Sequence, residues 1–511
     1  MSRTSKSVRN VIFAILGQLA MAAIGFIGRK IFVVFLNAEY LGLNGLFSSI
    51  LTVLSLAELG IGPAMIFSLY KPIAEKNIAV CQALMKVYQK AYRIIGFTVL
   101  IIGCCITPFI TFFINEIPEA ISGLHIIYIM FVINAAISYF FSYKRSLLIA
   151  NQDQYQINCI HTLSNLVMNV MQIMILALTK NYFLFLLIQI SFTLIENLIL
   201  SMQVDKIYPW LKEKSSLKEM PPEIRMEVER NVKAMIFHRI GGIAVDSSDR
   251  LLISKFFGLL FLGIYSNYLL IIDQLLAVIQ LFFTSITASI GNFGVEKSPE
   301  DAFDLFNKIY FINFWLAFFC TISFYTLATP FISSIWLGEQ YLMSKKILVV
   351  ISINFYIKSM RKTVLTFKEA FGLPWYDRYK PLISAVVNLV LSLFLAKRYG
   401  VIGIFLGTTI TDLCVNVWFE TYVVFKYCFR KSIYIFLKKY IKQLVFLIVC
   451  AAAIDSLSYL LPLSSDLGFW ISAIICFFIP NIVIIIIYRK TAEFAYIKGL
   501  VQSGYSKIIR R

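Results

Sequence analysis

The chain has 511 residues, 59% of them hydrophobic, and a mean hydropathy of +0.78. These values exclude an ordinary soluble protein of this size and indicate a membrane protein with many spans. Whole runs are apolar without polar alternation, so the pattern favours transmembrane helices over the strands of a barrel.

The formal net charge of +19 does not indicate nucleic-acid binding. Most Lys and Arg residues lie in the connections between apolar runs, and no basic helix stands apart to enter a groove. The nine cysteines show no CxxC spacing, so we expect packed small side chains rather than disulfides or zinc ligands. The three histidines, His125, His161 and His238, are too scattered along the chain to indicate a site.

Apolar runs bounded by charged residues, Gly and Pro predict an all-α integral membrane protein with about fourteen transmembrane helices. In chain order the expected spans are 11–36, 41–70, 94–115, 122–150, 157–179, 181–205, 232–257, 260–292, 305–330, 341–367, 380–396, 400–426, 440–461 and 467–488. Each run is long enough to cross the ~30 Å hydrocarbon layer at 1.5 Å per residue or close to it.

A polar connector separates the first six spans from the next six. We expect an N-terminal six-helix lobe at 1–205, a cytoplasmic connector at 206–231 and a C-terminal six-helix lobe at 232–428. Two additional helices and a basic cytoplasmic tail occupy 429–511. Most of the 47 Lys and Arg residues fall on one side of the membrane if both termini are cytoplasmic, so the positive-inside bias predicts that orientation.

The two lobes are related by an internal repeat. Shifting the chain by 221 positions places Asn10 on Asn231, Arg29 on Arg250 and the pair Leu41-Gly42 on Leu262-Gly263. Further matches need gaps: Arg145 with Arg361, Asn169 with Asn388, and Glu196 with Asp412, at offsets of 216 to 219. Six spans per copy give both copies the same orientation, and in transporters with such parallel repeats the substrate path lies between the halves.

Charged side chains occur inside the leading helix of each copy. A charge there costs about 2.5 to 3.5 kcal/mol on insertion scales, so it requires a partner, a wet cavity or a function. Arg239, Asp246 and Arg250 are spaced by seven and four residues, which places them on one helix face. Gln18 and Arg29 occupy the positions equivalent to the two arginines.

These polar positions predict an anion site. Guanidinium groups keep their charge and bind phosphate oxygens in pairs, so a diphosphate fits Arg29, Arg250, Arg239 and Gln18 as cavity ligands. The alternative is that Arg29 and Arg250 reach the outer headgroups or pair with acids. Arg239 could likewise pair with Asp246 or reach the inner surface.

Acidic side chains within spans are candidates for sodium or proton coupling, because burial favours protonation or cation binding. The candidates are Asp246, Glu196 and Asp412, with Asn388 and Thr409 as further oxygen ligands. Each acid could equally be the structural partner of a Lys or Arg, so no metal site is predicted firmly.

Gly60, Gly62 and Pro63 lie in the second half of the predicted span 41–70 and are hinge candidates. Proline removes a hydrogen bond within the helix and kinks it, which suits a transporter that alternates between two states. Kinks of this kind also occur in rigid spans, so a purely structural role is the alternative.

Three stretches of the N-terminal lobe resemble a known family. They are EYLGLNGLF at 39–47, AELGIGPA at 57–64 and SLYKP at 68–72. They look like the Wzx-type oligosaccharide repeat-unit flippases, in the polysaccharide transport group of the multidrug/oligosaccharidyl-lipid/polysaccharide exporter superfamily. The resemblance covers most of the chain and implies a MATE-like fold of two six-helix lobes around a cavity, with two extra helices as in lipid II flippases. It also implies that Arg29 and Arg250 engage a lipid diphosphate and that Asp246, Asn388 and Thr409 are the nearest sodium ligands.

The resemblance implies a flippase that moves undecaprenyl-diphosphate-linked oligosaccharide units across a bacterial plasma membrane for capsule or exopolysaccharide assembly. Anionic membrane lipid, a polysaccharide polymerase and assembly proteins are the further expected partners. One alternative is a cation-coupled multidrug antiporter of the same fold, although such a pump needs acids facing its cavity. Another is a membrane polysaccharide polymerase or ligase. The sequence has no GxSxG, HExxH or P-loop motif, so we expect no catalytic residue and no cofactor beyond Na⁺ or H⁺.

Overall fold

The computed structural model describes residues 3–58, 61–213, 222–459 and 466–509, although the side chains of 3–16 and most of those in 222–246 lie outside the description. The described residues form helices and turns, with no strand among them. The chain divides into two compact units, Met1–Ser266 and Asn267–Arg511. The division falls inside one long helix, so the leading span of the second repeat belongs to unit 1.

Unit 1 is built from α1 (Arg3–Leu54), α2 (Ile61–Ala74), α3 (Ile78–Ile106), α4 (Leu124–Ala150), α5 (Gln154–Thr179), α6 (Tyr182–Ile207) and the first part of α7 (Pro222–Glu296). Asparagines cap two of these helices. The Asn77 side chain accepts from the Val80 amide at 3.2 Å, and Asn181 accepts from the Phe183 amide at 2.8 Å. Such caps satisfy backbone N–H groups that a helix start leaves without partners.

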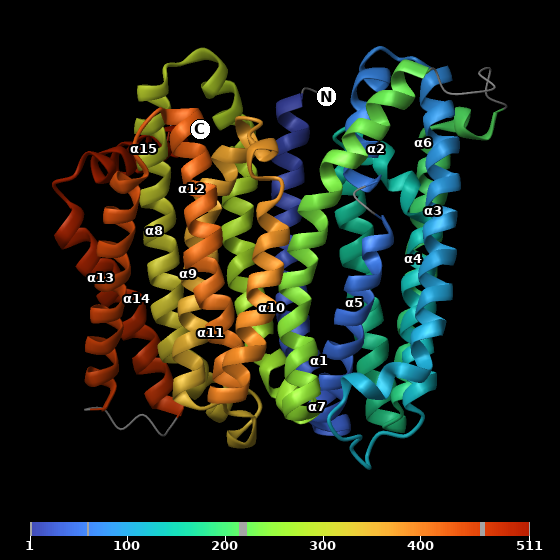
Figure 1. Cartoon of the computed structure of the whole chain (residues 1–511), viewed down its shortest axis with the longest axis horizontal. Coiled ribbons are helices and arrows are strands. Elements are labelled where there is room, and N and C mark those ends of the chain that lie inside the picture. The colour runs from blue at the N-terminus through green and yellow to red at the C-terminus, as the bar shows by residue number, and fades with distance from the viewer. Residues whose placement is uncertain (1–2, 59–60, 214–221, 460–465, 510–511) are drawn as a thin grey trace. The chain divides into compact units, whose positions relative to one another are not determined.

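Both α1 and α7 are interrupted at equivalent positions. Asn37 has a φ of 65° inside α1, and Gly258 has a φ of 83° inside α7. Asn and Gly are the residues that adopt positive φ most readily. The two positions are 221 residues apart, the offset of the sequence repeat. In Figure 1, α1 descends from the N-terminus and the chain then returns to α2. Each break therefore joins two membrane-crossing arms.

Unit 2 contains the rest of α7 and then α8 (Pro299–Pro330), α9 (Lys345–Ala370), α10 (Lys380–Tyr399), α11 (Val401–Thr411), α12 (Trp418–Val424), α13 (Ile433–Tyr459), α14 (Asp466–Tyr488) and α15 (Ala492–Ile509). Ser298 and Asp301 form a reciprocal cap at the start of α8, which follows the sequence signature of such a cap. A π-helical turn, Asp412–Val417, joins α11 to α12. Turns of this kind are common at functional or strained positions.

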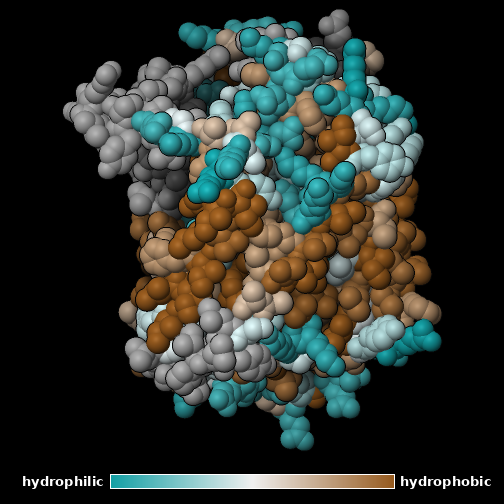
Figure 2. All heavy atoms as spheres, turned by 90° about the vertical axis from the view of Figure 1, so that its left-hand side faces the viewer, coloured by the Kyte–Doolittle hydropathy of each residue, from teal (hydrophilic) through white to brown (hydrophobic). Residues whose placement is uncertain are grey.

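Ten helical stretches among the described residues are long and apolar enough to cross a membrane. Two of them, Gly17–Glu58 and Ser247–Thr287, contain the breaks and so comprise two arms each. α9 and α13 are long enough to cross a membrane but are not among these ten stretches; counted with them, the crossings number the fourteen that the sequence predicts. On the face shown in Figure 2, hydrophobic side chains form a band between hydrophilic ends. The protein is therefore a multi-pass membrane protein.

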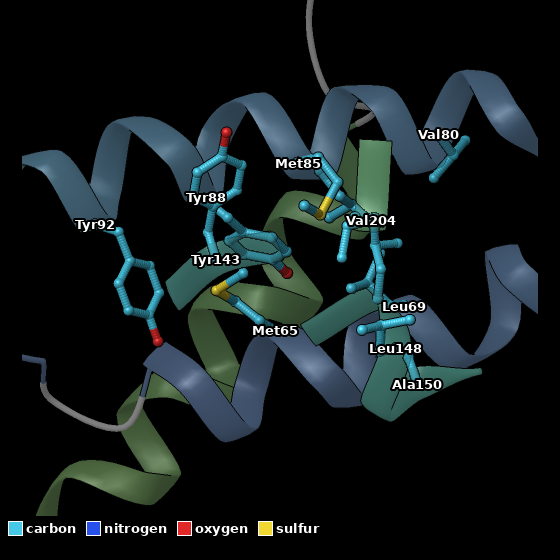
Figure 3. Packing of buried hydrophobic residues seen from close by; sticks show 12 residues of the cluster. Met65, Leu69, Val80, Met85, Tyr88, Tyr92, Tyr143, Leu148, Ala150 and Val204 are labelled. Atoms are coloured by element: carbon cyan, nitrogen blue, oxygen red, sulfur yellow. The ribbon is translucent and has the colours of Figure 1, made fainter. Parts of the chain in front are cut away.

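The predicted span 41–70 is not one helix. α1 ends at Leu54, a 3-10 turn covers Ser55–Glu58, and α2 begins at Ile61. In unit 1 the start of α2 packs against α3, α4 and α6 in a cluster of buried hydrophobic residues. Figure 3 shows Met65, Met85 and Tyr143 at the centre of this cluster, and Tyr92 reaching toward the start of α2. The Tyr92 hydroxyl donates a 2.8 Å hydrogen bond to Glu58.

Candidate functional site

The helices α1 and α7 cross at two glycines that the repeat makes equivalent. A Cβ atom on Gly42 would overlap the carbonyl oxygen of Leu259, and one on Gly263 would overlap the carbonyl oxygen of Ala38. Ala38 and Leu259 are themselves 221 residues apart. The crossing is therefore nearly symmetric within unit 1, because each helix uses its own glycine to admit the backbone of the other.

Arg29 and Arg250 lie near each other on these two helices. They are close enough for the charge of Arg250 to act on Arg29, and both side chains are half-buried. Nη1 of Arg29 donates a 2.9 Å hydrogen bond to Ser266 Oγ, which donates in turn to the Gly263 carbonyl at 2.7 Å. Among the side chains that the structure describes, no ion pair joins either arginine to an acid. An anion between or beside the two would offset their repulsion.

The other predicted members of this site are placed only in part. Gln18 lies on α1, half-buried and with interactions of its own. The side chains of Arg239 and Asp246 lie outside the described residues, although both positions belong to α7. The anion site with Arg29, Arg250, Arg239 and Gln18 as its ligands stays a prediction.

Glu196 lies in a charged cluster of unit 1. Arg145 of α4 donates a 2.9 Å hydrogen bond to its carboxylate, and Nδ1 of His161 on α5 lies 3.2 Å from the same oxygen. These three helices surround a cavity of about 280 Å³. Its lining includes the polar side chains of Asn134, Ser138, Arg145, His161, Ser164, Asn165, Gln189, Thr193, Glu196 and Asn197, together with Ala135, Met168 and Phe192.

Asp412 lies in a closed network of unit 2. Arg361 donates to Asp412 at 2.7 Å and to both carboxylate oxygens of Glu420 at 2.8 and 3.0 Å. Lys380 donates to Glu420 at 2.5 Å, and Asn416 donates to Asp412 at 2.6 Å. Two cations balance two acids, and all four charged side chains are at most 16% exposed. Paired, fully hydrogen-bonded charges of this kind are stable when buried.

The remaining coupling candidates do not gather around Asp412. The Asn388 amide donates to Thr408 Oγ1 at 3.0 Å. The Thr409 hydroxyl lies 2.5 Å from Asn354 Oδ1 and 2.9 Å from the Phe405 carbonyl. Asp412 itself is engaged by Arg361. A sodium site formed by Asn388, Thr409, Asp412 or Asp246 stays a prediction. The side chains of Asn388, Thr409 and Asp412 form hydrogen bonds with residues other than one another.

The hinge candidates flank the interruption before α2. Gly60 lies outside the described residues. Gly62 and Pro63 belong to the first turn of α2, where a proline is tolerated because the first N–H groups have no intrahelical partner. The proline thus stands near a helix start rather than inside a continuous span. Whether this junction moves during transport stays a prediction.

Sequence reasoning missed His161, Lys380 and Glu420. The three histidines are scattered along the chain, but folding brings His161 against Glu196. The repeat contained a usable signal, because the offset of 219 that aligns α5 with α10 also aligns His161 with Lys380. Glu420 had no such signal, since Val204 stands at the equivalent position in α6.

No protein-family model matches this sequence, and no curated protein matches it. Solved structures do match. An inward-facing multidrug resistance MATE family transporter of the MOP superfamily aligns with a TM-score of 0.62 at 14% identity, covering 81% of this chain and 98% of its own. Lipid II flippase MurJ, in an inward closed conformation, aligns with a TM-score of 0.62 at 15% identity, covering 95% of this chain and 99% of its own.

A third match is a MOP superfamily transporter from Pyrococcus furiosus whose binding pocket is described as reversed in polarity. It aligns with a TM-score of 0.54 at 15% identity, covering 84% of this chain and 96% of its own. At such identities the likeness establishes the fold alone. The all-helical chain, with its repeated pair of broken helices and its multiple spans, has the fold shared by MATE transporters and the lipid II flippase MurJ.

Proposed function

We propose that this protein is a flippase that moves undecaprenyl-diphosphate-linked oligosaccharide units from the inner to the outer leaflet of a bacterial plasma membrane. The observation that carries the proposal is the placement of Arg29 and Arg250 near each other on adjacent membrane helices. Two guanidinium groups without an acid among the described side chains suit a diphosphate, which accepts paired hydrogen bonds. The likeness to a lipid II flippase supports a lipid-linked substrate.

A multidrug antiporter is the second candidate, because MATE transporters share the fold. A cationic drug would be repelled by Arg29 and Arg250, whereas an acidic cavity would attract it. The transporter with a pocket of reversed polarity supports the idea that one fold accommodates ligands of either charge. We therefore favour the anionic, lipid-linked glycan over a cationic drug, and we propose assembly of capsule or exopolysaccharide as the pathway.

The test uses a strain that lacks the protein and expresses variants of the full chain. Replacing both arginines, Arg29→Ala with Arg250→Ala, should abolish polymer export and trap the lipid-linked unit on the inner leaflet. Replacing both by lysine should restore only part of the export, because an ammonium group keeps the charge but loses the bidentate geometry. Arg378→Ala is the matched control, since Arg378 stacks on the exposed Trp375 ring 4.0 Å away.

The leaflet on which the intermediate accumulates separates the candidates. Full export by the double alanine variant, with normal amounts of protein in the membrane, would overturn the role of the arginines. Accumulation on the outer leaflet in the deletion strain would instead indicate a polymerase or ligase. Lost resistance to cationic compounds, with polymer unaffected, would indicate the multidrug antiporter.

A further inference from the structure

The two units contain the same ion pair at equivalent positions. Arg145 and Glu196 are 51 residues apart in unit 1, and Arg361 and Asp412 are 51 residues apart in unit 2. Each residue of the unit 1 pair lies 216 positions before its counterpart in unit 2. An arginine–carboxylate pair therefore occurs at equivalent positions of both repeats. It joins α4 to α6 in unit 1, and α9 to the π-helical turn after α11 in unit 2.

The second cation of the cluster differs between the units. Lys380 of unit 2 stands where unit 1 has His161, and Lys380 lies 2.5 Å from Glu420, an acid that Arg361 also bonds. Unit 1 has Val204 in place of that acid. In place of the Lys–Glu pair of unit 2, unit 1 thus has a single imidazole, a group that can gain or lose a proton.

Because of this replacement, the net charge of the Arg145–Glu196–His161 cluster depends on whether His161 is protonated. With His161 neutral, Arg145 and Glu196 balance each other at 2.9 Å. In the tautomer that carries its proton on Nδ1, His161 donates to the carboxylate of Glu196, and the lone pair of Nε2 lies 3.3 Å from Asn165 Nδ2. A proton added at Nε2 creates an imidazolium beside the same carboxylate, and the cluster gains one positive charge. The network of unit 2 has no comparable state, because both of its acids are already engaged by cations.

The cavity has room for water beside His161. Its volume of about 280 Å³ has room for several water molecules, each of which occupies about 30 Å³ in the liquid. The His161 side chain is 54% exposed. Two buried atoms of the cavity lining, Asn134 Oδ1 and Arg145 Nε, have no partner within the described structure, and water in the cavity would satisfy both.

The surroundings favour a proton over a metal ion. A sodium ion at Glu196 would lie beside the Arg145 guanidinium, which already holds the carboxylate at 2.9 Å. A proton needs no set of ligands, since one imidazole nitrogen is sufficient.

The other charged groups facing this cluster are few. From α4 and α6, Lys144 and Asp205 pair with each other at 2.6 Å. α1 meets α5 where Gly17 packs on Thr162, and the first charged side chain described on α1 is Arg29, twelve residues further, about 18 Å along the helix. Within the described side chains, Glu196 is thus the charged group in contact with His161, and Arg145 bonds the same carboxylate.

We propose that His161 and Glu196 form a proton-binding site in unit 1, opened by the cavity between α4, α5 and α6, and that the proton is the coupling ion of transport. Binding at Nε2 raises the charge of a cluster that joins three helices, so it changes how strongly α5 is held against α4 and α6. The coupling role rests on the proposed transport function, whereas proton binding itself does not.

Proton binding is measured without substrate. The full chain is reconstituted in vesicles of phosphatidylethanolamine and phosphatidylglycerol on a solid-supported membrane, and the transient charge displacement after a pH jump is recorded. The native protein should give a displacement that a sodium jump at constant pH does not reproduce. His161→Gln should lose it. His161→Lys, which introduces the residue found in unit 2, should fold and also lose it.

Two matched controls make the result specific. His125→Gln removes an exposed histidine at the start of α4 and should keep the displacement. The double variant Arg29→Ala, Arg250→Ala should also keep it, so failure of the flippase proposal would not abolish this signal. Native displacement in both His161 variants would overturn the site, and a response to sodium rather than pH would overturn the choice of ion.

Coupling is tested last, by glycan export in cells of the deletion strain that express each variant. His161→Gln should reduce export while leaving the amount of protein in the membrane unchanged. Full export by this variant, together with a lost charge displacement, would show that the site binds protons without coupling them, which would overturn the coupling role alone.

Discussion

Arg361 shows how a single residue keeps two buried acids compatible with a membrane interior. Its guanidinium group bonds Asp412 through one nitrogen and Glu420 through two others. The planar, forked geometry of arginine is what allows three such bonds from one side chain. Removing it would leave Asp412 without its cation, while Glu420 would keep Lys380.

We therefore expect Arg361→Ala to destabilise the protein strongly, by about 3–5 kcal/mol, because a buried charge is left without its partner. The measurement is the melting temperature of the purified chain in detergent. Lys345→Ala is the control, since it removes an ion pair to Asp455 whose side chains are 50% and 29% exposed. Such a pair contributes about 0–1 kcal/mol. Equal losses in the two variants would contradict this account.

The element that most constrains unit 1 is the crossing of α1 and α7. Two broken helices pass each other at Gly42 and Gly263, where any side chain would meet a backbone carbonyl. Backbone cannot move aside as a flexible side chain can, so the two positions exclude larger residues. The same helices carry Arg29 and Arg250, so their spacing affects the proposed anion site.

Gly42→Ala should lower stability by about 1–3 kcal/mol, the usual cost of overpacking, and should lower the melting temperature in detergent. Gly45→Ala is a matched control one turn further along α1. A Cβ atom there would meet the Leu262 side chain at 3.6 to 3.9 Å, which is ordinary van der Waals contact. A Gly42→Ala protein as stable as the native chain would show that the two helices are not this close.

For the whole molecule, the span count determines whether the two termini lie on the same side of the membrane. An even count such as the predicted fourteen crossings would place both termini on the same side of the membrane, and the distribution of Lys and Arg predicts that this side is the cytoplasm. Six crossings in each repeat also give the two copies the same direction, which agrees with equivalent breaks at Asn37 and Gly258.

Reporter fusions test this orientation. Green fluorescent protein joined after Arg511 should fluoresce, whereas alkaline phosphatase at the same point should be inactive, because the phosphatase needs an oxidising exterior to form its disulfides. A phosphatase fusion after Gly123, between α3 and α4, should be active. An active fusion at Arg511 would indicate an odd number of crossings or the opposite orientation.

The sequence by itself determined the membrane class, the number of spans and the repeat, since each depends on local hydrophobicity or on residue spacing. It also identified Arg29, Arg250, Glu196 and Asp412 as unusual, because a charge within an apolar run is visible without a structure. Gly60, Gly62 and Pro63 indicated a kink in the predicted span 41–70, but the sequence did not show that α1 ends at Leu54 and that a 3-10 turn covers Ser55–Glu58.

Only the tertiary structure decided which partners these charges have. Glu196 meets His161, 35 residues away in the chain, and Asp412 meets Arg361, 51 residues away, and no local pattern ranks such pairs. The contrast between an open cluster in unit 1 and a closed one in unit 2 depends on one substituted cation, one missing acid and a cavity. Hydrophobicity places a helix in the membrane, but packing between helices determines whether a buried charge is neutralised or left able to change.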